Sequence, residues 1–235
     1  MKKRKLGTRG ILMLTCMSIM IVSVFITAFI GLMGVDKMNE NGIQNYDGAM
    51  NDGYNNEIKT QVQAVISLIS HYYKLSESGK ITEEEAKEQA LEAVRNMRYG
   101  VDYDKDGVND GYFWIDSTDY TLVMHPILTE QEGDNRKEIK DQNGVYILQN
   151  IMKTAEKGGG FNEFYFTKSD GKTIAPKVAY SEEFKPWNWV ITTGNYVDDM
   201  RSQLKDTSHN MDAILERISL QLMIAVAVML VVAVF

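Results

Sequence analysis

The chain of 235 residues carries an uncharged apolar run near each end of its sequence, at residues 10–35 and at residues 218–235. Because about 20 apolar residues cross a bilayer, the pattern predicts two transmembrane helices, of which the second is slightly short. A cleavable signal peptide is the alternative for the first run. Its apolar core would be shorter, about 7 to 15 residues, and would end at a small-residue cleavage site, and neither feature is present.

Basic residues concentrate before the first run, as Lys2, Lys3, Arg4, Lys5 and Arg9. The positive-inside rule therefore predicts that residues 1–9 form a cytoplasmic tail and that residues 36–217 lie outside the cytoplasm. The second span would return the chain to the cytoplasm. We therefore expect a multi-pass protein of the cell membrane, inner or plasma, and interpret the chain as the front part of a longer polypeptide whose cytoplasmic signalling region is absent here.

Helical periodicity marks three segments between the predicted spans. Apolar residues recur three and four positions apart from residue 50 to residue 73, which predicts a long helix within residues 36–75. Thr82 and Glu85 have the spacing of a capping box and predict a second helix over residues 83–97. A third stripe over residues 145–155 predicts a helix that ends at the glycines 158–160.

Runs of aromatic and β-branched residues predict the strands. Residues 112–115 and 120–124 frame a polar turn at residues 116–119, and Pro126, which lacks an N–H group, ends this hairpin. Three more strands are predicted at residues 161–167, 172–180 and 187–193, before a helix that starts at Val197. The predicted fold class is α+β, with an antiparallel sheet of about five strands, a long N-terminal helix and two flanking membrane helices.

Charge and cysteine content narrow the classes of partner. Without the five basic residues of the tail, 20 Lys and Arg face 32 Asp and Glu, so the remainder carries a net charge of -12. Nucleic acid is therefore not an expected partner, because phosphate binding needs a basic patch. The single cysteine, Cys16, lies inside the first apolar run, so we expect no disulfide framework.

An acidic segment, DYDKDGVND, lies between the second predicted helix and the hairpin. Its oxygen-bearing positions and its glycine at the sixth place match the first nine positions of a calcium loop, with the ligands Asp102, Asp104, Asp106, Val108 and Asp110. The twelfth position, however, is Phe113 in place of a bidentate Glu. Ca²⁺ is thus one interpretation of the loop, and a solvated acidic turn is the other.

Several segments, taken in order, resemble the single Cache domains of the second type, the PAS-like sensors of bacterial chemoreceptors. They are LEAVRNMRYG, DGYFWIDSTDYTLVMHP, DNRKEIKDQNG, GGGFNEFYF and PKVAYSEEFKPWNWVITTGNYVDDM. The resemblance covers residues 36–200 together with the two flanking spans. The acidic loop before Gly111 departs from the family pattern as an insertion, which affects the geometry expected around Arg98.

The resemblance implies a sheet that holds a small ligand, often a short carboxylate, without catalytic chemistry or a required cofactor. A buried carboxylate needs a positive partner and hydrogen-bond donors. Residues of these kinds, with apolar walls for a short carbon chain, fall in the matching segments: Arg98, Tyr99, Tyr112, Trp114, His125, Phe164, Lys177 and Tyr180. Structural roles are the alternative for each, and an amine or urea is the alternative ligand.

The leading hypothesis is therefore the sensing domain of a methyl-accepting chemotaxis receptor, homodimeric through its long helices. The input domain of a sensor histidine kinase or of a cyclic-dinucleotide enzyme is the alternative within the same class. A membrane-bound hydrolase finds no support, because the sequence contains neither G-x-S-x-G nor H-E-x-x-H. A calcium-dependent adhesive module would rest on the acidic loop alone, since the sequence shows no internal repeats.

Overall fold

The computed structural model describes residues 7–103, 105–168, 172–199, 201, 213–221, 223–225 and 227–228. The chain divides into two compact units, Met1–Ala49 with Leu204–Phe235, and Met50–Gln203. In the first unit, the helical segment Thr8–Gly31 has a mean hydropathy of 2.4 and is long and apolar enough to cross a membrane. This segment agrees with the first predicted span, whereas much of the second predicted span, residues 218–235, lies outside the described residues.

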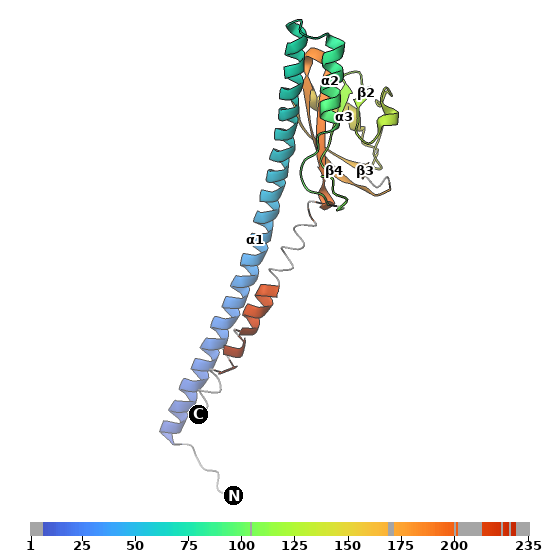
Figure 1. Cartoon of the computed structure of the whole chain (residues 1–235). Coiled ribbons are helices and arrows are strands. Elements are labelled where there is room, and N and C mark those ends of the chain that lie inside the picture. Colours follow the sequence, from blue (N-terminus) through green and yellow to red (C-terminus); the bar gives the residue numbers. More distant parts are fainter. Residues whose placement is uncertain are drawn as a thin grey trace. The chain divides into compact units, whose positions relative to one another are not determined.

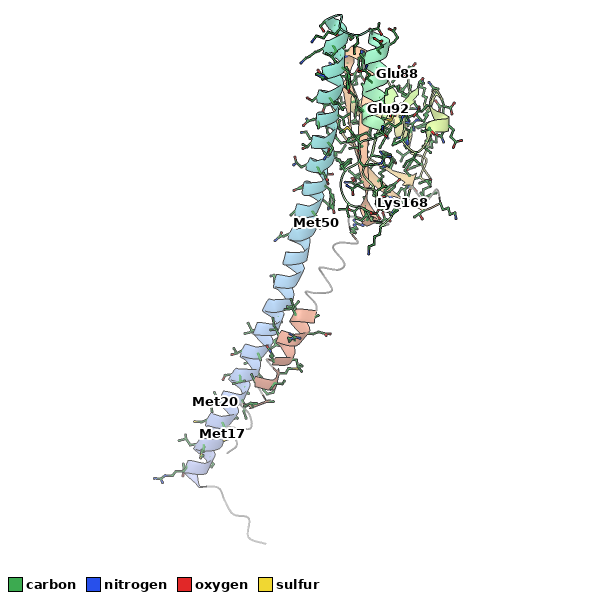
Figure 2. The ribbon with its side chains drawn as sticks, viewed as in Figure 1. Met17, Met20, Met50, Glu88, Glu92 and Lys168 are labelled. Atoms are coloured by element: carbon green, nitrogen blue, oxygen red, sulfur yellow. The ribbon has the colours of Figure 1, made fainter. Side chains whose placement is uncertain are left out.

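Helix α1 (Thr8–Glu77) and helix α2 (Glu83–Arg95) bear out the predicted helical stripes. Thr82 caps α2, because its side chain accepts from the amide of Glu85 while the carboxylate of Glu85 accepts from the amide of Thr82. The polar face of α2 is solvated, with Glu88 and Glu92 exposed (Figure 2). The capping box therefore sets the start of a helix whose opposite face carries the buried Ala86, Ala90 and Val94.

The second unit contains one antiparallel sheet of five strands in the order β2-β1-β5-β4-β3 (Figure 1). The strands are β1 (Phe113–Ser117), β2 (Leu122–Met124), β3 (Gly160–Thr167), β4 (Ile174–Phe184) and β5 (Trp189–Tyr196). Helix α3 (Ile147–Ala155) precedes β3, and short 3-10 turns lie at Thr129–Gln131 and Lys185–Trp187. The predicted five-stranded antiparallel sheet with a long N-terminal helix is confirmed.

Two hydrophobic cores lie on opposite faces of this sheet, because alternate side chains of a strand point to opposite sides. Phe113, Ile115 and Ile191 pack with residues of α2 and of the part of α1 that belongs to this unit, such as Val62 and Val94. On the other face, Tyr112, Trp114 and Val190 pack against α3. The strands thus carry one apolar face toward α1 and α2 and a second toward α3.

Several element boundaries differ from the predictions by a few residues. β1 continues through Asp116 to Ser117, so the first half of the predicted turn is strand, and Asp116 is fully buried. β4 extends to Phe184, four residues beyond its predicted end. Trp187 ends a 3-10 turn rather than starting a strand, because Asn188 adopts a left-handed conformation with φ of 53°. After β5, residues 197–199 and 201 are helical, as predicted from Val197 onward.

Candidate ligand-binding site

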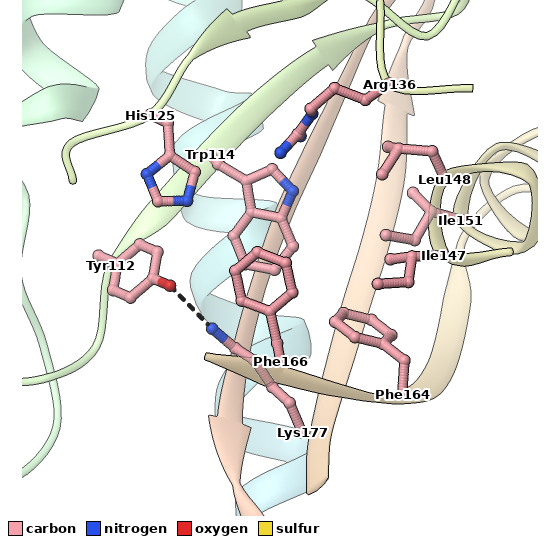
Figure 3. A pocket seen from close by; sticks show the side chains of 10 residues that line it. All are labelled: Tyr112, Trp114, His125, Arg136, Ile147, Leu148, Ile151, Phe164, Phe166 and Lys177. Atoms are coloured by element: carbon pink, nitrogen blue, oxygen red, sulfur yellow. Dashed lines mark hydrogen bonds between the residues drawn. The ribbon is translucent and has the colours of Figure 1, made fainter. Parts of the chain in front are cut away.

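A small cavity lies between the sheet and α3 (Figure 3). Residues 125–146, which join β2 to α3 and are called the joining segment below, contribute His125 and Arg136 to its wall. Its volume of about 20 Å³ accommodates one water-sized group. The residues around it come from β1 and the position before it, from β3, β4 and α3, and from the joining segment: Tyr112, Trp114, His125, Arg136, Ile147, Leu148, Ile151, Phe164, Phe166 and Lys177. None of these ten side chains is acidic. The polar ones, Tyr112, Trp114, His125, Arg136 and Lys177, all carry hydrogen-bond donors, and Arg136 and Lys177 are cations.

Lys177 supplies the central charge of this cavity. β4 directs its side chain onto the α3 face of the sheet, where only 1% of the residue is exposed. The Nζ atom donates to the hydroxyl of Tyr112 at 3.0 Å and lies 4.5 Å and 4.9 Å from the ring centres of Tyr112 and Trp114. Within the part of the chain that the structure describes, no carboxylate pairs with this ammonium group. A buried cation without a counter-ion is costly unless an anion joins it.

His125, at the end of β2, contributes a neutral donor. Its Nδ1 accepts from the amides of Ile127 and Leu128 at 3.1 Å and 3.0 Å, so the neutral ring carries its proton on Nε2. Burial, reinforced by the charges of Lys177 and Arg136, lowers the pKa of His125 to about 3. The imidazole is therefore uncharged at physiological pH, and its Nε2–H group remains available as a donor to a ligand.

Arg136 is the second cation of the wall, and Asp116 pairs with it. Arg136 comes from the joining segment and is 7% exposed, and its Nε and Nη2 donate to Oδ1 of Asp116 at 3.1 Å and 2.5 Å. Oδ2 of Asp116 is buried and has no hydrogen-bond partner among the described residues. Burial raises the pKa of Asp116 to about 6, although the guanidinium group of Arg136 opposes that shift.

A second ion pair holds the backbone of His125. Arg95, the last residue of α2, donates through Nη1 and Nη2 to the two carboxylate oxygens of Glu132 at 2.6 Å and 2.9 Å. Oε1 of Glu132 also accepts from the amide of His125 at 2.8 Å, and Arg95 reaches the carbonyl of His125 at 3.3 Å. The joining segment is thus fastened to α2 at the point where it starts to cover the cavity.

Apolar side chains complete the wall and adjoin a larger hollow. Ile147, Leu148 and Ile151 project from α3, and Phe164 and Phe166 project from β3. Beside the cavity lies a groove of about 430 Å³, which shares four of the ten lining residues, Tyr112, His125, Ile147 and Phe166. These four shared side chains lie between the small cavity and the larger groove.

The structure gathers five of the eight predicted ligand-binding residues around the cavity: Tyr112, Trp114, His125, Phe164 and Lys177. Arg98 is exposed and donates to the carbonyls of Arg95 and Met97 at the end of α2. Tyr99 and Tyr180 belong to the core on the opposite face of the sheet. Arg98, Tyr99 and Tyr180 therefore lie away from this cavity, and ligand binding by the eight residues stays a prediction.

Sequence reasoning missed Arg136, Phe166 and the three α3 residues that line the cavity. Phe166 carries a usable signal, because it is two positions from Phe164 on the same strand and must share its face. The apolar stripe of α3 was recognised, but its packing partner was not. Arg136 carries no signal, since it stands in a polar stretch without periodicity and is brought to the cavity by the path of the joining segment.

The acidic loop caps its own backbone. The carboxylate of Asp102 accepts from the amides of Asp106 and Gly107, Asp106 accepts from Val108, and Asp110 accepts from Tyr103. The residues described, which leave out Asp104, contain no group of three or more acidic, His or Cys side chains placed to hold a metal ion. Calcium binding by Asp102, Asp104, Asp106, Val108 and Asp110 stays a prediction that this geometry does not test.

Comparison with known proteins decides the family. The model of the single Cache domain 2 family matches residues 50–210, which is more than half of the chain. The chain belongs to the single Cache domain 2 family. The match coincides with the unit that contains the sheet and its cavity, so the cavity is a feature of the Cache domain itself.

Relatives of this Cache domain include whole receptors. It is 29% identical over 171 residues to the methyl-accepting chemotaxis protein McpP of Pseudomonas putida, covering 72% of this chain and 30% of that protein. It is 26% identical over 207 residues to the sensor histidine kinase MctS of Rhizobium johnstonii, covering 88% of this chain and 42% of the kinase. The chain therefore spans less than half the length of either relative.

Solved structures share the fold. A periplasmic sensor domain of a chemotaxis protein is 30% identical with a TM-score of 0.55, and the similarity covers 61% of this chain and 94% of that domain. A Cache chemosensory domain studied for the structural basis of carboxylic acid recognition is 26% identical with a TM-score of 0.58. The similarity covers 64% of this chain and 97% of that domain. Nearly all of each sensor domain is thus matched by this Cache domain.

Proposed function

We propose that this Cache domain is the extracytoplasmic sensor of a chemotaxis receptor and that it binds a short carboxylate in the cavity beneath the joining segment. One observation carries the proposal, namely the buried ammonium group of Lys177, which has no acidic partner among the described residues. An anion that enters the cavity gives this cation a counter-ion and gives the Nε2–H group of His125 an acceptor.

The wall opposite these polar groups sets the expected size of the ligand. Ile147, Ile151 and Phe164 leave room for little more than a water-sized group, because the cavity has a volume of about 20 Å³. Even a ligand of two or three carbons needs the side chains that separate the cavity from the groove to shift. Rearrangement of Tyr112 and Phe166, which belong to both spaces, is the step that we expect binding to require.

Similar proteins support both parts of the proposal, a carboxylate as the ligand and a chemotaxis receptor as the protein. One related Cache domain has been studied for carboxylic acid recognition, and McpP is a methyl-accepting chemotaxis protein. The match to MctS over 88% of this chain favours a second candidate, the input domain of a sensor histidine kinase. Sequencing of the gene beyond the codon for residue 235 tests which of the two output domains, if either, follows.

The membrane setting belongs to the same proposal. The candidate span Thr8–Gly31 anchors the chain, and the basic residues before it keep the N-terminus in the cytoplasm. The second predicted span, residues 218–235, would make the protein multi-pass. Pairing of two chains through their long helices completes the proposed receptor.

Calorimetry of the 235-residue chain in lipid nanodiscs tests the binding function, with acetate and propionate as probes and methylamine and urea as the contrasting ligands. We expect a carboxylate to bind and Lys177→Met to weaken it about 10-fold to 100-fold, as for a lost charge-assisted hydrogen bond. Lys80→Met, at an exposed lysine, is the matched control and should bind normally. Unchanged affinity in Lys177→Met, or binding of methylamine alone, would overturn the proposal.

A further inference from the structure

Asp116 is the only carboxylate paired with a cation of the cavity wall in the described structure, yet it does not line the cavity. It is fully buried, and only its Oδ1 atom bonds to Arg136. The side chain of Arg136 also lines the cavity (Figure 3). Its bonds to Asp116 use Nε and Nη2, so its Nη1 forms no hydrogen bond to a described residue. Arg136 can therefore donate to a ligand while Asp116 compensates its charge.

The charges around the cavity then sum to a single positive charge. Lys177 contributes one cation, Arg136 and Asp116 cancel, and His125 is neutral. A monoanion neutralises this environment, whereas a dianion would leave a negative charge without a partner beside these buried side chains, which is strongly unfavourable. The pairing partner of Arg136 thus controls how much negative charge the cavity accepts.

We propose that Asp116 is a specificity-determining residue that restricts the site to monocarboxylates without touching them, by cancelling the charge of Arg136. This inference rests on the proposed function, because it concerns which carboxylates the same cavity takes. Removal of the charge at Asp116 raises the net charge of the cavity to two, so dicarboxylates gain a second cationic partner and monocarboxylates bind more tightly.

Protonation of Asp116 removes its negative charge, so it should raise the net charge of the cavity in the same way as a substitution that removes this charge. Arg136 faces Asp116 from the joining segment and the side chain of Trp114 lies beside it on β1, and both oppose the rise of its pKa. The nearby α3 presents only the apolar Ile147, Leu148 and Ile151. Burial and the unpartnered Oδ2 favour the protonated acid, and its pKa of about 6 lies close to physiological pH. His125 does not compete in this range, because its pKa lies at about 3. Monocarboxylate affinity therefore increases as the pH falls toward 5.5.

The test is calorimetry of the 235-residue chain in nanodiscs with propionate and succinate. For the wild type, we expect propionate to bind about sixfold more tightly at pH 5.5 than at pH 7.5, which corresponds to a rise of one in the pKa of Asp116 on binding. Titrations in two buffers of different ionisation enthalpy should show the accompanying proton uptake. Succinate at pH 7.5 should bind at least tenfold more weakly than propionate.

Asp116→Asn keeps the side-chain shape and its acceptor for Arg136, so it isolates the charge. We expect a propionate affinity at pH 7.5 close to that of the wild type at pH 5.5, no further pH dependence, and newly measurable succinate binding. Asp119→Asn makes the same substitution at an exposed position of the same hairpin and should behave as the wild type. A pH-dependent Asp116→Asn variant that still rejects succinate would overturn the inference.

The wild-type data decide the matter even if Asp116→Asn does not fold. Propionate binding that does not change with pH, or succinate binding equal to that of propionate at pH 7.5, contradicts the role of Asp116 and leaves the carboxylate sensor intact. Absence of propionate, acetate and succinate binding at every pH contradicts the proposed function itself. The two failures are therefore distinguishable in one set of titrations.

Discussion

Lys177 and Tyr196 are register partners on β4 and β5, and the Nζ atom of Lys177 lies 4.7 Å from the centre of the Tyr196 ring. Tyr196 donates from its hydroxyl to the carbonyl of Thr167 at 2.7 Å. Lys168, labelled in Figure 2 beside the end of β3, pairs with Asp198 and Asp199 at 2.8 Å and 2.6 Å. The last residue of β5 therefore contacts the cation of the cavity immediately before the chain becomes helical.

Lys177→Met should stabilise the domain although it weakens ligand binding. The methionine side chain has a similar length and fits among aromatic rings without the cost of burying an ammonium group, while the bond to Tyr112 is lost. We expect the free energy of unfolding without ligand to rise by about 1 to 3 kcal/mol. Denaturant unfolding of Lys177→Met, with Lys80→Met as the control, measures it, and a loss of stability would show that the lysine is a structural element.

His125→Asn should reduce the acid sensitivity of the fold. The folded-state pKa of His125 is lowered to about 3, so its contribution to stability is present above the ordinary histidine pKa and is lost as the pH falls below it. Between pH 7 and pH 5 this loss amounts to about 2 kcal/mol. The amide oxygen of asparagine can replace Nδ1 as the acceptor for Ile127 and Leu128, so the turn is kept.

Asp116 changes the pH dependence of stability in the direction opposite to His125, so the two contributions must be measured separately. Its folded-state pKa is raised to about 6, so its contribution to stability is present at low pH and is lost as the pH rises through that value. Unfolding free energies of the wild type, His125→Asn and Asp116→Asn at pH 7 and pH 5 resolve the two. An equal change between the two pH values in wild type and His125→Asn would show that His125 is not held neutral.

Glu132→Gln should loosen the joining segment and weaken carboxylate binding. Although partial burial opposes the shift, the bonds from Arg95 and from the amide of His125 hold the pKa of Glu132 below its usual value, so it is an anion here. Glutamine keeps one acceptor but loses the paired charge, and we expect a cost of about 1 kcal/mol in stability. Hydrogen exchange of residues 125–135 should increase in this variant and remain unchanged in Glu130→Gln, at an exposed position of the same segment.

Substitution of alanine for glycine should change the stability of the domain in opposite directions at Gly111 and Gly53. A Cβ atom at Gly111 would lie 2.5 Å from the carbonyl oxygen and 2.8 Å from the ring of Tyr99, so Gly111→Ala should destabilise the domain by about 1 to 3 kcal/mol. At Gly53, in α1, a Cβ atom meets nothing within 4 Å, and Gly53→Ala should stabilise by about 0.5 to 1 kcal/mol. Thermal melts of both variants measure these effects, and a stabilised Gly111→Ala would contradict the close approach to Tyr99.

Local signals made the fold predictable. The Thr82 and Glu85 capping box, the stripe of α3 and the aromatic runs of β1 and β3 are each read from neighbouring residues, and the structure contains all of them. The turn after β1 was placed too early, because Asp116 is a residue type typical of turns. Its burial depends on Arg136, which lies 20 positions away, and no local pattern reports such a pair.

The candidate site was only partly predictable for a related reason. Lys177 and Tyr180 lie three positions apart on one strand, so they must face opposite sides of the sheet, and this parity could have excluded Tyr180. Tyr99 is placed on the α1 face by its hydrogen bond to Thr193, a contact that crosses most of the domain sequence. Long-range contacts of this kind decide which chemically suitable residues meet.

β5 is bonded along both of its edges, to β1 by five register pairs and to β4 by eight. Because its residues alternate between two cores, a slip by one position would turn Ile191 and Val190 to the wrong sides. We therefore expect the pairing to oppose sliding of β5 along its neighbours. A movement that reaches residue 197 from the cavity is then expected to be a tilt or twist that β5 shares with β1 and β4.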